Sequence, residues 1–157
     1  MDACEQTERV DSASRMILAT PRQLFRTYFD AEKMKSWRVP DGATGTYSVL
    51  EPQPGGRFCL NLLYSDRAEI DGPEAAIEII TGTFTEFLPD ERVVEAIRYT
   101  NADAAYSGMM TLTLTIEPAK VGSKVSLHAT GMPPALEVTA HRATLAAALR
   151  RLALLTE

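Results

Sequence analysis

The spacing of hydrophobic residues changes twice along the chain, from a helical period to a strand period and back. A short strand is expected at residues 14–19. Residues 20–23 (TPRQ) then have the order of a helix start: a hydroxyl cap, Pro at the first helical position, and Gln where a capping box needs it. A helix should begin there, and residues 30–37 predict a second short helix that ends before 39–42 (VPDG).

Between residues 45 and 131, apolar residues recur at every second position, which is the period of a half-buried strand. The clearest case is 110–116 (MTLTLTI), where apolar residues alternate with Thr. Further strands are expected at 46–50, 57–64, 77–88, 92–99 and 124–129. Turn sequences separate them and the connections are short, so the strands should form an antiparallel sheet.

The segment 51–60 (EPQPGGRFCL) contains a Gly pair that could bind phosphate or simply turn the chain. A phosphate loop places its glycines between a strand and a helix, where backbone N–H groups and the helix dipole meet the anion. Gly55 and Gly56 lead into a strand instead. The pair therefore predicts a turn.

A helical period returns after residues 131–134 (GMPP). One face carries Val138, His141, Leu145, Leu149 and Leu152, which predicts a long amphipathic C-terminal helix. Strands followed by a segregated helix indicate an α+β fold, with the helix laid across one face of the sheet.

The composition favours one ordinary globular domain over residues 1–157, with residues 1–12 as a flexible tail. The net charge is -5, and no basic face for nucleic acid is apparent. The polar N-terminus lacks the features of a secretory signal, and no apolar run approaches the ~20 residues of a membrane span. We expect a cytoplasmic protein without a membrane span, and leave a homodimer open.

Metal, disulfide and cofactor chemistry have little support in the sequence. Cys4 and Cys59 show no CxxC spacing, so neither a disulfide nor a zinc site is expected. His128 and His141 fall on different elements without metal-ligand spacing. His128 has the parity of the outer sheet face, and no cofactor is expected.

Four segments in this order resemble the activator of heat-shock protein 90 ATPase homologue-like family, within the START-like (SRPBCC) superfamily: 20–37 (TPRQLFRTYFDAEKMKSW), 52–58 (PQPGGRF), 84–93 (FTEFLPDERV) and 149–155 (LRRLALL). The likeness extends from about Arg15 to Leu155. It implies a helix-grip fold, in which a curved antiparallel sheet wraps around the long C-terminal helix and encloses a cavity. Two short helices follow the first strand.

The sequence departs from the family pattern at two places. Arg38 stands where a second Trp commonly follows Trp37, and Thr144-Leu145 stands where a Gly-Trp pair is usual. Both changes remove aromatic bulk. Because members of the family differ widely in function, the resemblance supports the fold more strongly than any inherited ligand.

Two polar residues occupy positions that should be apolar. Glu95 shares the parity of its apolar neighbours in 92–99 (RVVEAIRY), so it either points inward and needs a cation or donor, or lies at an edge or bulge that turns it outward. His141 lies on the helix face toward the sheet, as a core or rim residue or as a polar contact in the pocket. If both reached the cavity, they could act as acid and base. Arg142 could neutralise an acidic ligand or be solvated.

The residues expected to line the cavity are Trp37, Phe58, Leu60, Tyr64, Phe84, Glu95, Ile97, Met110, Leu112, Val138, His141, Arg142 and Leu145. Our first hypothesis is a non-enzymatic protein that binds a small hydrophobic or amphipathic molecule there. The alternative is an enzyme of the polyketide cyclase or hydrolase type known in the wider superfamily, using Glu95 and His141. A second alternative, suggested by the family name, is a chaperone-interacting protein.

Overall fold

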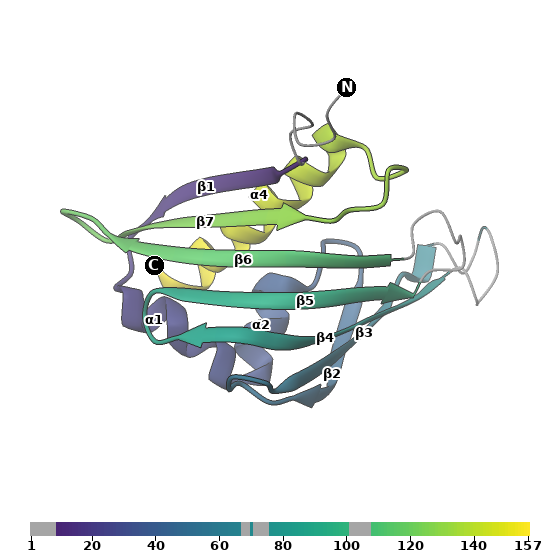
Figure 1. Ribbon diagram of the computed structural model, residues 1–157, viewed down its shortest axis with the longest axis horizontal. Helices are drawn as coiled ribbons and strands as arrows, with labels where there is room; N and C mark the ends of the chain where they lie inside the picture. Colours follow the sequence, from purple (N-terminus) through teal and green to yellow (C-terminus); the bar gives the residue numbers. More distant parts are fainter. Residues whose placement is uncertain (1–8, 67–69, 71–75, 101–107) are drawn as a thin grey trace, which may run out of the picture.

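The computed structural model describes residues 9–66, 70, 76–100 and 108–157 (Figure 1). Its strands form one antiparallel sheet in the order β1-β7-β6-β5-β4-β3-β2. Each strand from β2 to β6 pairs with the next one along the chain, and β1 pairs with β7 at the edge of the sheet opposite β2. The strands are β1 (Asp11–Ile17), β2 (Thr44–Leu50), β3 (Arg57–Leu63), β4 (Ile77–Leu88), β5 (Arg92–Thr100), β6 (Gly108–Pro118) and β7 (Ser123–Thr130).

All the predicted strands form, with small differences at their ends. The largest difference is in β1, which begins at Asp11 and not at Ser14. Asp11 pairs with Ala129 of β7, so residues 11 and 12 belong to the sheet and not to the expected tail. The rest of that predicted tail, apart from Arg9 and Val10, lies outside the described residues.

The short helices after β1 form as the sequence predicts. Thr20 accepts a hydrogen bond from the Gln23 amide at 3.2 Å, and the Gln23 side chain accepts one from the Thr20 amide at 2.9 Å, which completes the capping box. Asp30 caps the second helix by accepting from the next turn's amides. The helices are α1 (Pro21–Arg26), the 3₁₀ helix η2 (Thr27–Phe29), α2 (Ala31–Arg38) and the C-terminal α4 (Val138–Thr156).

The helices cover one face of the curved sheet (Figure 1). Helix α4 packs against β1 and α2, and Glu137 caps its first turn by accepting from the amides of Thr139 and Ala140. This is the α+β helix-grip arrangement expected from the sequence. No helix in the described part of the chain is long and apolar enough to cross a membrane.

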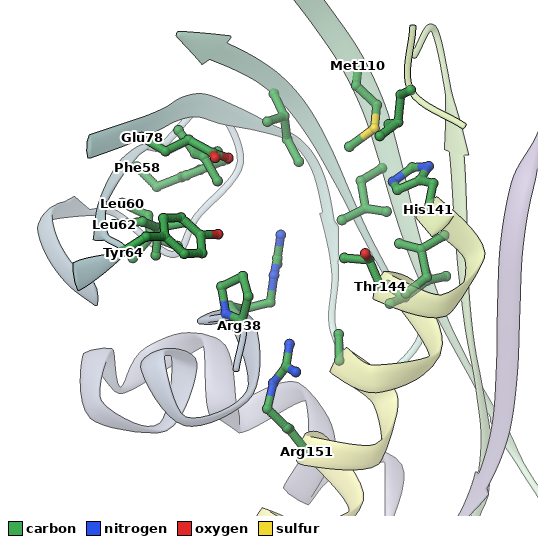
Figure 2. Close-up of a pocket in the computed structure, with 18 of the residues that line it drawn as sticks. Arg38, Phe58, Leu60, Leu62, Tyr64, Glu78, Met110, His141, Thr144 and Arg151 are labelled. Carbon is green, nitrogen blue, oxygen red and sulfur yellow. The ribbon is translucent and has the colours of Figure 1, made fainter. Parts of the chain in front are cut away.

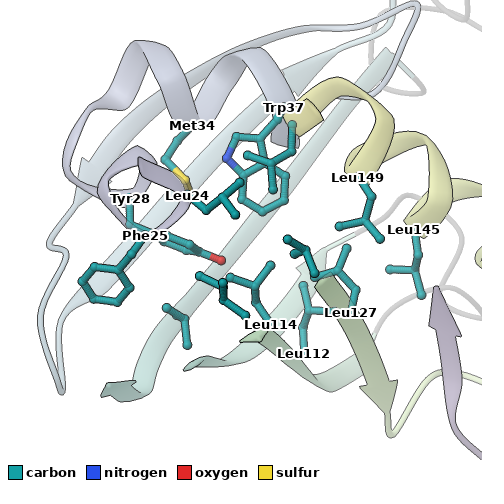
Figure 3. Packing of buried hydrophobic residues seen from close by; sticks show 14 of the residues in the cluster. Leu24, Phe25, Tyr28, Met34, Trp37, Leu112, Leu114, Leu127, Leu145 and Leu149 are labelled. Carbon is teal, nitrogen blue, oxygen red and sulfur yellow. The ribbon is translucent and has the colours of Figure 1, made fainter. Parts of the chain in front are cut away.

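An aromatic cluster fills the space between the short helices and the sheet (Figure 3). Tyr28 is at its centre, with its ring edge-on to Trp37 and Phe84 at 6.0 Å and to Phe87 at 5.7 Å. Edge-to-face pairs of this kind stabilise a core beyond the area that they bury. The cluster therefore holds the short helices against β4.

The Gly pair forms the turn between β2 and β3, as predicted. Gly55 has φ +78°, and its amide donates to the Phe84 carbonyl at 2.7 Å. The Phe84 amide in turn donates to the Gly56 carbonyl at 2.8 Å. These bonds attach the turn to β4, and the Gly55 amide is used within the protein.

Candidate functional site

A pocket of about 480 Å³ lies between the inner face of the sheet and α4 (Figure 2). Its size is within the range of small-molecule sites. The sheet side is contributed by Tyr47, Phe58, Leu60, Leu62, Glu78, Ile80, Ile97, Met110, Leu112 and Leu127. The helices and connecting segments contribute Arg38, Pro40, Tyr64, Pro133, Leu136, His141, Thr144, Leu145, Ala148 and Arg151.

Many of the residues predicted for the cavity line this pocket, namely Phe58, Leu60, Tyr64, Ile97, Met110, Leu112, His141 and Leu145. Strand parity and helix face were sufficient to find them, because each side chain points toward the inner face of its element. Thr144 and Leu145, at the positions where the resemblance implies a Gly-Trp pair, both line the pocket.

Other predicted pocket residues lie elsewhere, which corrects those assignments. Trp37 and Phe84 are fully packed in the aromatic cluster. Val138 is the half-buried first residue of α4 and lies outside the pocket wall. Arg142 is exposed, because it follows His141 by one position and points about 100° away around the helix. Glu95 lies behind the wall, as described next.

Glu95 is only 2% exposed, so it takes the inward position, one of the two alternatives that the sequence left open. The alternative of an edge or bulge position is therefore wrong. Arg38 donates two hydrogen bonds to its carboxylate, from Nη1 to Oε2 at 2.7 Å and from Nη2 to Oε1 at 2.8 Å. The Tyr28 hydroxyl donates a longer bond of 3.4 Å to Oε2. Arg38 lines the pocket and Glu95 does not, so the pocket meets the guanidinium side of this pair.

Burial and the ion pair together shift the pKa values of Arg38 and of the two tyrosines beside it. Burial alone would lower the pKa of Arg38, but the charge and hydrogen bonds of Glu95 raise that pKa well above its usual value. Burial raises the pKa of Tyr47 to about 12, with Arg38 opposing the shift and Glu95 adding to it. Burial and then Glu95 raise the pKa of Tyr28 well above normal. Near neutral pH, Arg38 is thus a cation and both tyrosines keep their protons.

His141 is held by a second buried carboxylate. Its Nδ1 lies 2.8 Å from Oδ2 of Asp11, and the two side chains are 6% and 0% exposed. Arg9 also donates to Asp11, from Nε at 3.0 Å and from Nη2 at 2.7 Å. The Arg9 hydrogen bond lowers the pKa of Asp11 against the effect of burial, and the His141 bond lowers it further.

This arrangement sets the tautomer of His141. An ionised Asp11 accepts hydrogen bonds only, so Nδ1 carries the proton. In the neutral imidazole, Nε2 is then the acceptor nitrogen, and none of the described residues donates a hydrogen bond to it. Because His141 lines the pocket, its neutral imidazole would present this acceptor nitrogen there.

The predicted acid–base pair of Glu95 and His141 is therefore not assembled. Glu95 is bound by Arg38 and His141 is bound to Asp11. Sequence reasoning missed both partners. In the sequence, Arg38 stands out only as a departure from the family pattern, and Asp11 falls in the expected tail.

The described His, Cys, Asp and Glu side chains do not gather into a metal site. Within the described ranges, no group of three or more His, Cys, Asp or Glu side chains is placed to hold a metal ion. Cys59 is a free, half-buried thiol in β3, and Cys4 lies outside the described residues. His128 is exposed on β7, as its parity predicted.

The comparisons with known proteins agree with this fold. The structure resembles the crystal structure of a protein from Chromobacterium violaceum, with a TM-score of 0.81 and 23% identity. The match covers 94% of this chain and 96% of the other. It also resembles the AHSA1 protein of Silicibacter pomeroyi, with a TM-score of 0.74 and 17% identity over 93% of this chain and 96% of the other. A third match is the AHSA1-like protein of Aeromonas hydrophila, with a TM-score of 0.72 and 16% identity over 94% of this chain and 91% of the other. At these identities the likeness concerns the fold alone.

At the level of sequence, no curated protein matches the chain. The family model described as "Activator of Hsp90 ATPase homolog 1-like protein" matches residues 18–157, which is most of its length. The segments that carry the resemblance in the sequence fall within this match. The chain therefore belongs to the Activator of Hsp90 ATPase homolog 1-like family.

Proposed function

We propose that the protein binds a small hydrophobic or amphipathic molecule in the pocket between the sheet and α4. The pocket itself is the observation that carries this proposal: about 480 Å³, with a mainly apolar wall and a few polar groups. Sites of this kind are the usual location of small ligands. The fold is typically a ligand-binding scaffold, which supports the same function.

The two kinds of wall residue would have different roles. Leu60, Ile97 and Leu112 would cover the apolar part of a ligand, at roughly 25 cal/mol for each Å² removed from water. Arg38 and His141 would orient its polar part, because their geometry is already fixed by Glu95 and Asp11. A site whose polar groups are held in place loses little entropy on binding.

A change that fills the pocket tests this function. Ala148 lies on the pocket wall, whereas Ala146 is an exposed residue of the same helix. We expect decanoate or decanol to raise the melting temperature of the wild type, since a ligand that binds only the folded state stabilises it. Ala148→Phe should abolish that rise and Ala146→Phe should preserve it. No rise with either compound, or an unchanged rise in Ala148→Phe, would contradict the proposal.

A second candidate function follows from the Asp11–His141 contact. A histidine whose Nδ1–H is held by a buried carboxylate presents Nε2 as a general base. In ester hydrolysis, Nε2 would take a proton from water while the water oxygen bonds to the ester carbonyl carbon. The carbon–oxygen bond to the alcohol would then break, and the proton would pass to the leaving alcohol. The pocket would hold the acyl chain.

The two histidines make a matched test of this activity. p-Nitrophenyl decanoate would be hydrolysed by the wild type, and the rate would fall to the background value in His141→Gln. His128→Gln should keep the wild-type rate, because His128 is exposed on the sheet. Equal rates in the two variants would remove hydrolysis from consideration and leave binding as the function.

A further inference from the structure

The side chain of Arg151 is a half-buried cation at the pocket with few partners among the described residues. It lies on α4, lines the pocket and is only 13% exposed. Its Nε donates to the Trp37 carbonyl at 3.1 Å, and no other hydrogen bond links it to the described residues. Among the described residues, the nearest carboxylate oxygen is on Asp41, 3.7 Å from Nη1. Asp41 is 72% exposed and is shared with Arg150 at 3.4 Å.

The charges around Arg151 leave it under-compensated. Burial lowers its pKa, and the nearby cations Arg150 and Arg38 lower it further, while Asp41 opposes the shift. A cation that has lost water without gaining a close counter-ion is costly. An anion brought into the pocket beside it would offset that cost.

The other charged groups on the pocket wall indicate where such an anion would lie. The guanidinium of Arg38 is already neutralised by Glu95. Figure 2 shows Arg38 and Arg151 extending from the two helices into the same space, with Glu78 on the opposite, sheet side. An anion would therefore lie at the helix end of the pocket, away from Glu78.

The apolar sheet wall and Arg151 together define a class of ligand. We infer that the pocket takes an amphipathic molecule with an anionic group, that Arg151 binds this group, and that the apolar chain of the molecule lies against β3, β5 and β6. The inference rests on the proposed binding function and adds the chemistry of the ligand. A carboxylate fits best, because the planar fork of a guanidinium can donate two parallel hydrogen bonds to it.

Decanoate and decanol test the inference, since they share a chain and differ in charge. We expect the wild type to bind decanoate at least about tenfold more tightly than decanol near neutral pH, as measured by calorimetric titration. A tenfold preference is the scale of one charged hydrogen bond. Arg151→Gln should remove this preference while decanol still binds. Arg150→Gln is the matched control, because Arg150 is adjacent but absent from the pocket wall, and it should keep the preference.

Arg151→Lys separates charge from folding. This variant keeps a cation and loses only the planar guanidinium, so it should recover part of the preference for decanoate that Arg151→Gln loses. Its melting temperature shows whether loss of the hydrogen bond to the Trp37 carbonyl destabilises the fold. Equal binding of the two compounds by the wild type, or a preference that survives in Arg151→Gln, would overturn the inference and leave the binding function intact. If neither compound bound the wild type, the proposed function and this inference would both fall.

Discussion

Arg38, the last residue of α2, and Glu95, in the middle of β5, form a buried ion pair with hydrogen bonds of 2.7 and 2.8 Å. Their side chains are 14% and 3% exposed. The pair connects α2 to the sheet, with Tyr28 of the aromatic cluster on one side of Glu95 and the pocket beside Arg38. It also accounts for the carboxylate on the apolar face of β5, because Arg38 neutralises its charge.

Breaking this pair from one side should be strongly destabilising. Glu95→Gln leaves the Arg38 guanidinium buried without a counter-ion, and we expect a loss of about 3–5 kcal/mol in the free energy of unfolding, measured by urea denaturation. Glu86→Gln is the control, because the Arg92–Glu86 pair is 44% and 43% exposed. Its loss should be about 0–1 kcal/mol.

Removing both charges should cost less than removing one. In the double variant Arg38→Met with Glu95→Met, no buried charge is left unpaired, so we expect higher stability than in either single variant. The account of this pair is wrong if Glu95→Gln costs no more than Glu86→Gln, or if the double variant is the least stable of the set.

The Asp11 network predicts how stability depends on pH. The pKa of Asp11 is lowered in the folded protein, chiefly by its hydrogen bond with Arg9. A lowered carboxyl pKa stabilises the fold above the unfolded value and loses this effect as pH falls through the folded value. Asp11→Asn should lose about 1–3 kcal/mol near neutral pH. Its difference from the wild type should shrink only below about pH 4, near the unfolded pKa of Asp.

Asp41→Asn serves as the comparison for Asp11→Asn, because the Asp41 side chain is 72% exposed and has only long contacts with Arg150 and Arg151. Urea denaturation across the acid range should give nearly the wild-type curve for it. A gap between wild type and Asp11→Asn that stays constant down to the lowest pH would show that Asp11 does not titrate as described.

The two turn glycines should differ in their tolerance of Ala. A Cβ on Gly55 would meet open space, and only the positive φ opposes it, at a cost of about 1–2 kcal/mol. A Cβ on Gly56 would collide with the Glu51 carbonyl oxygen, so the turn itself must move. We therefore expect Gly56→Ala to lower the midpoint of urea denaturation more than Gly55→Ala. The reverse order would contradict this geometry.

The sequence was sufficient for the fold because its local signals agree with one another. The capping box at Thr20, the alternation in 110–116 and the face of α4 each specify one element, and the short connections specify antiparallel pairing. The pocket wall was predictable where it depends on these periods, as at Leu60, Ile97 and Leu112.

The polar partners could not be predicted, because they join residues far apart in the chain. Period left open whether Glu95 points inward or is turned outward, and it gave no sign that Arg38 reaches Glu95. Asp11 reaches His141 only because β1 pairs at the sheet edge beside α4. Trp37 and Phe84 were misplaced because period distinguishes inside from outside but not core from cavity. The chaperone contact suggested by the family name and the homodimer stay predictions.

Native mass spectrometry of the purified protein, before and after incubation with decanoate, tests the binding function most directly. We expect a discrete additional mass on the wild type that is released on denaturation, present in Ala146→Phe and absent from Ala148→Phe. Such a result would place the bound molecule in the pocket. A wild type that stays bare under both conditions, or an additional mass carried equally by Ala148→Phe, would contradict the account.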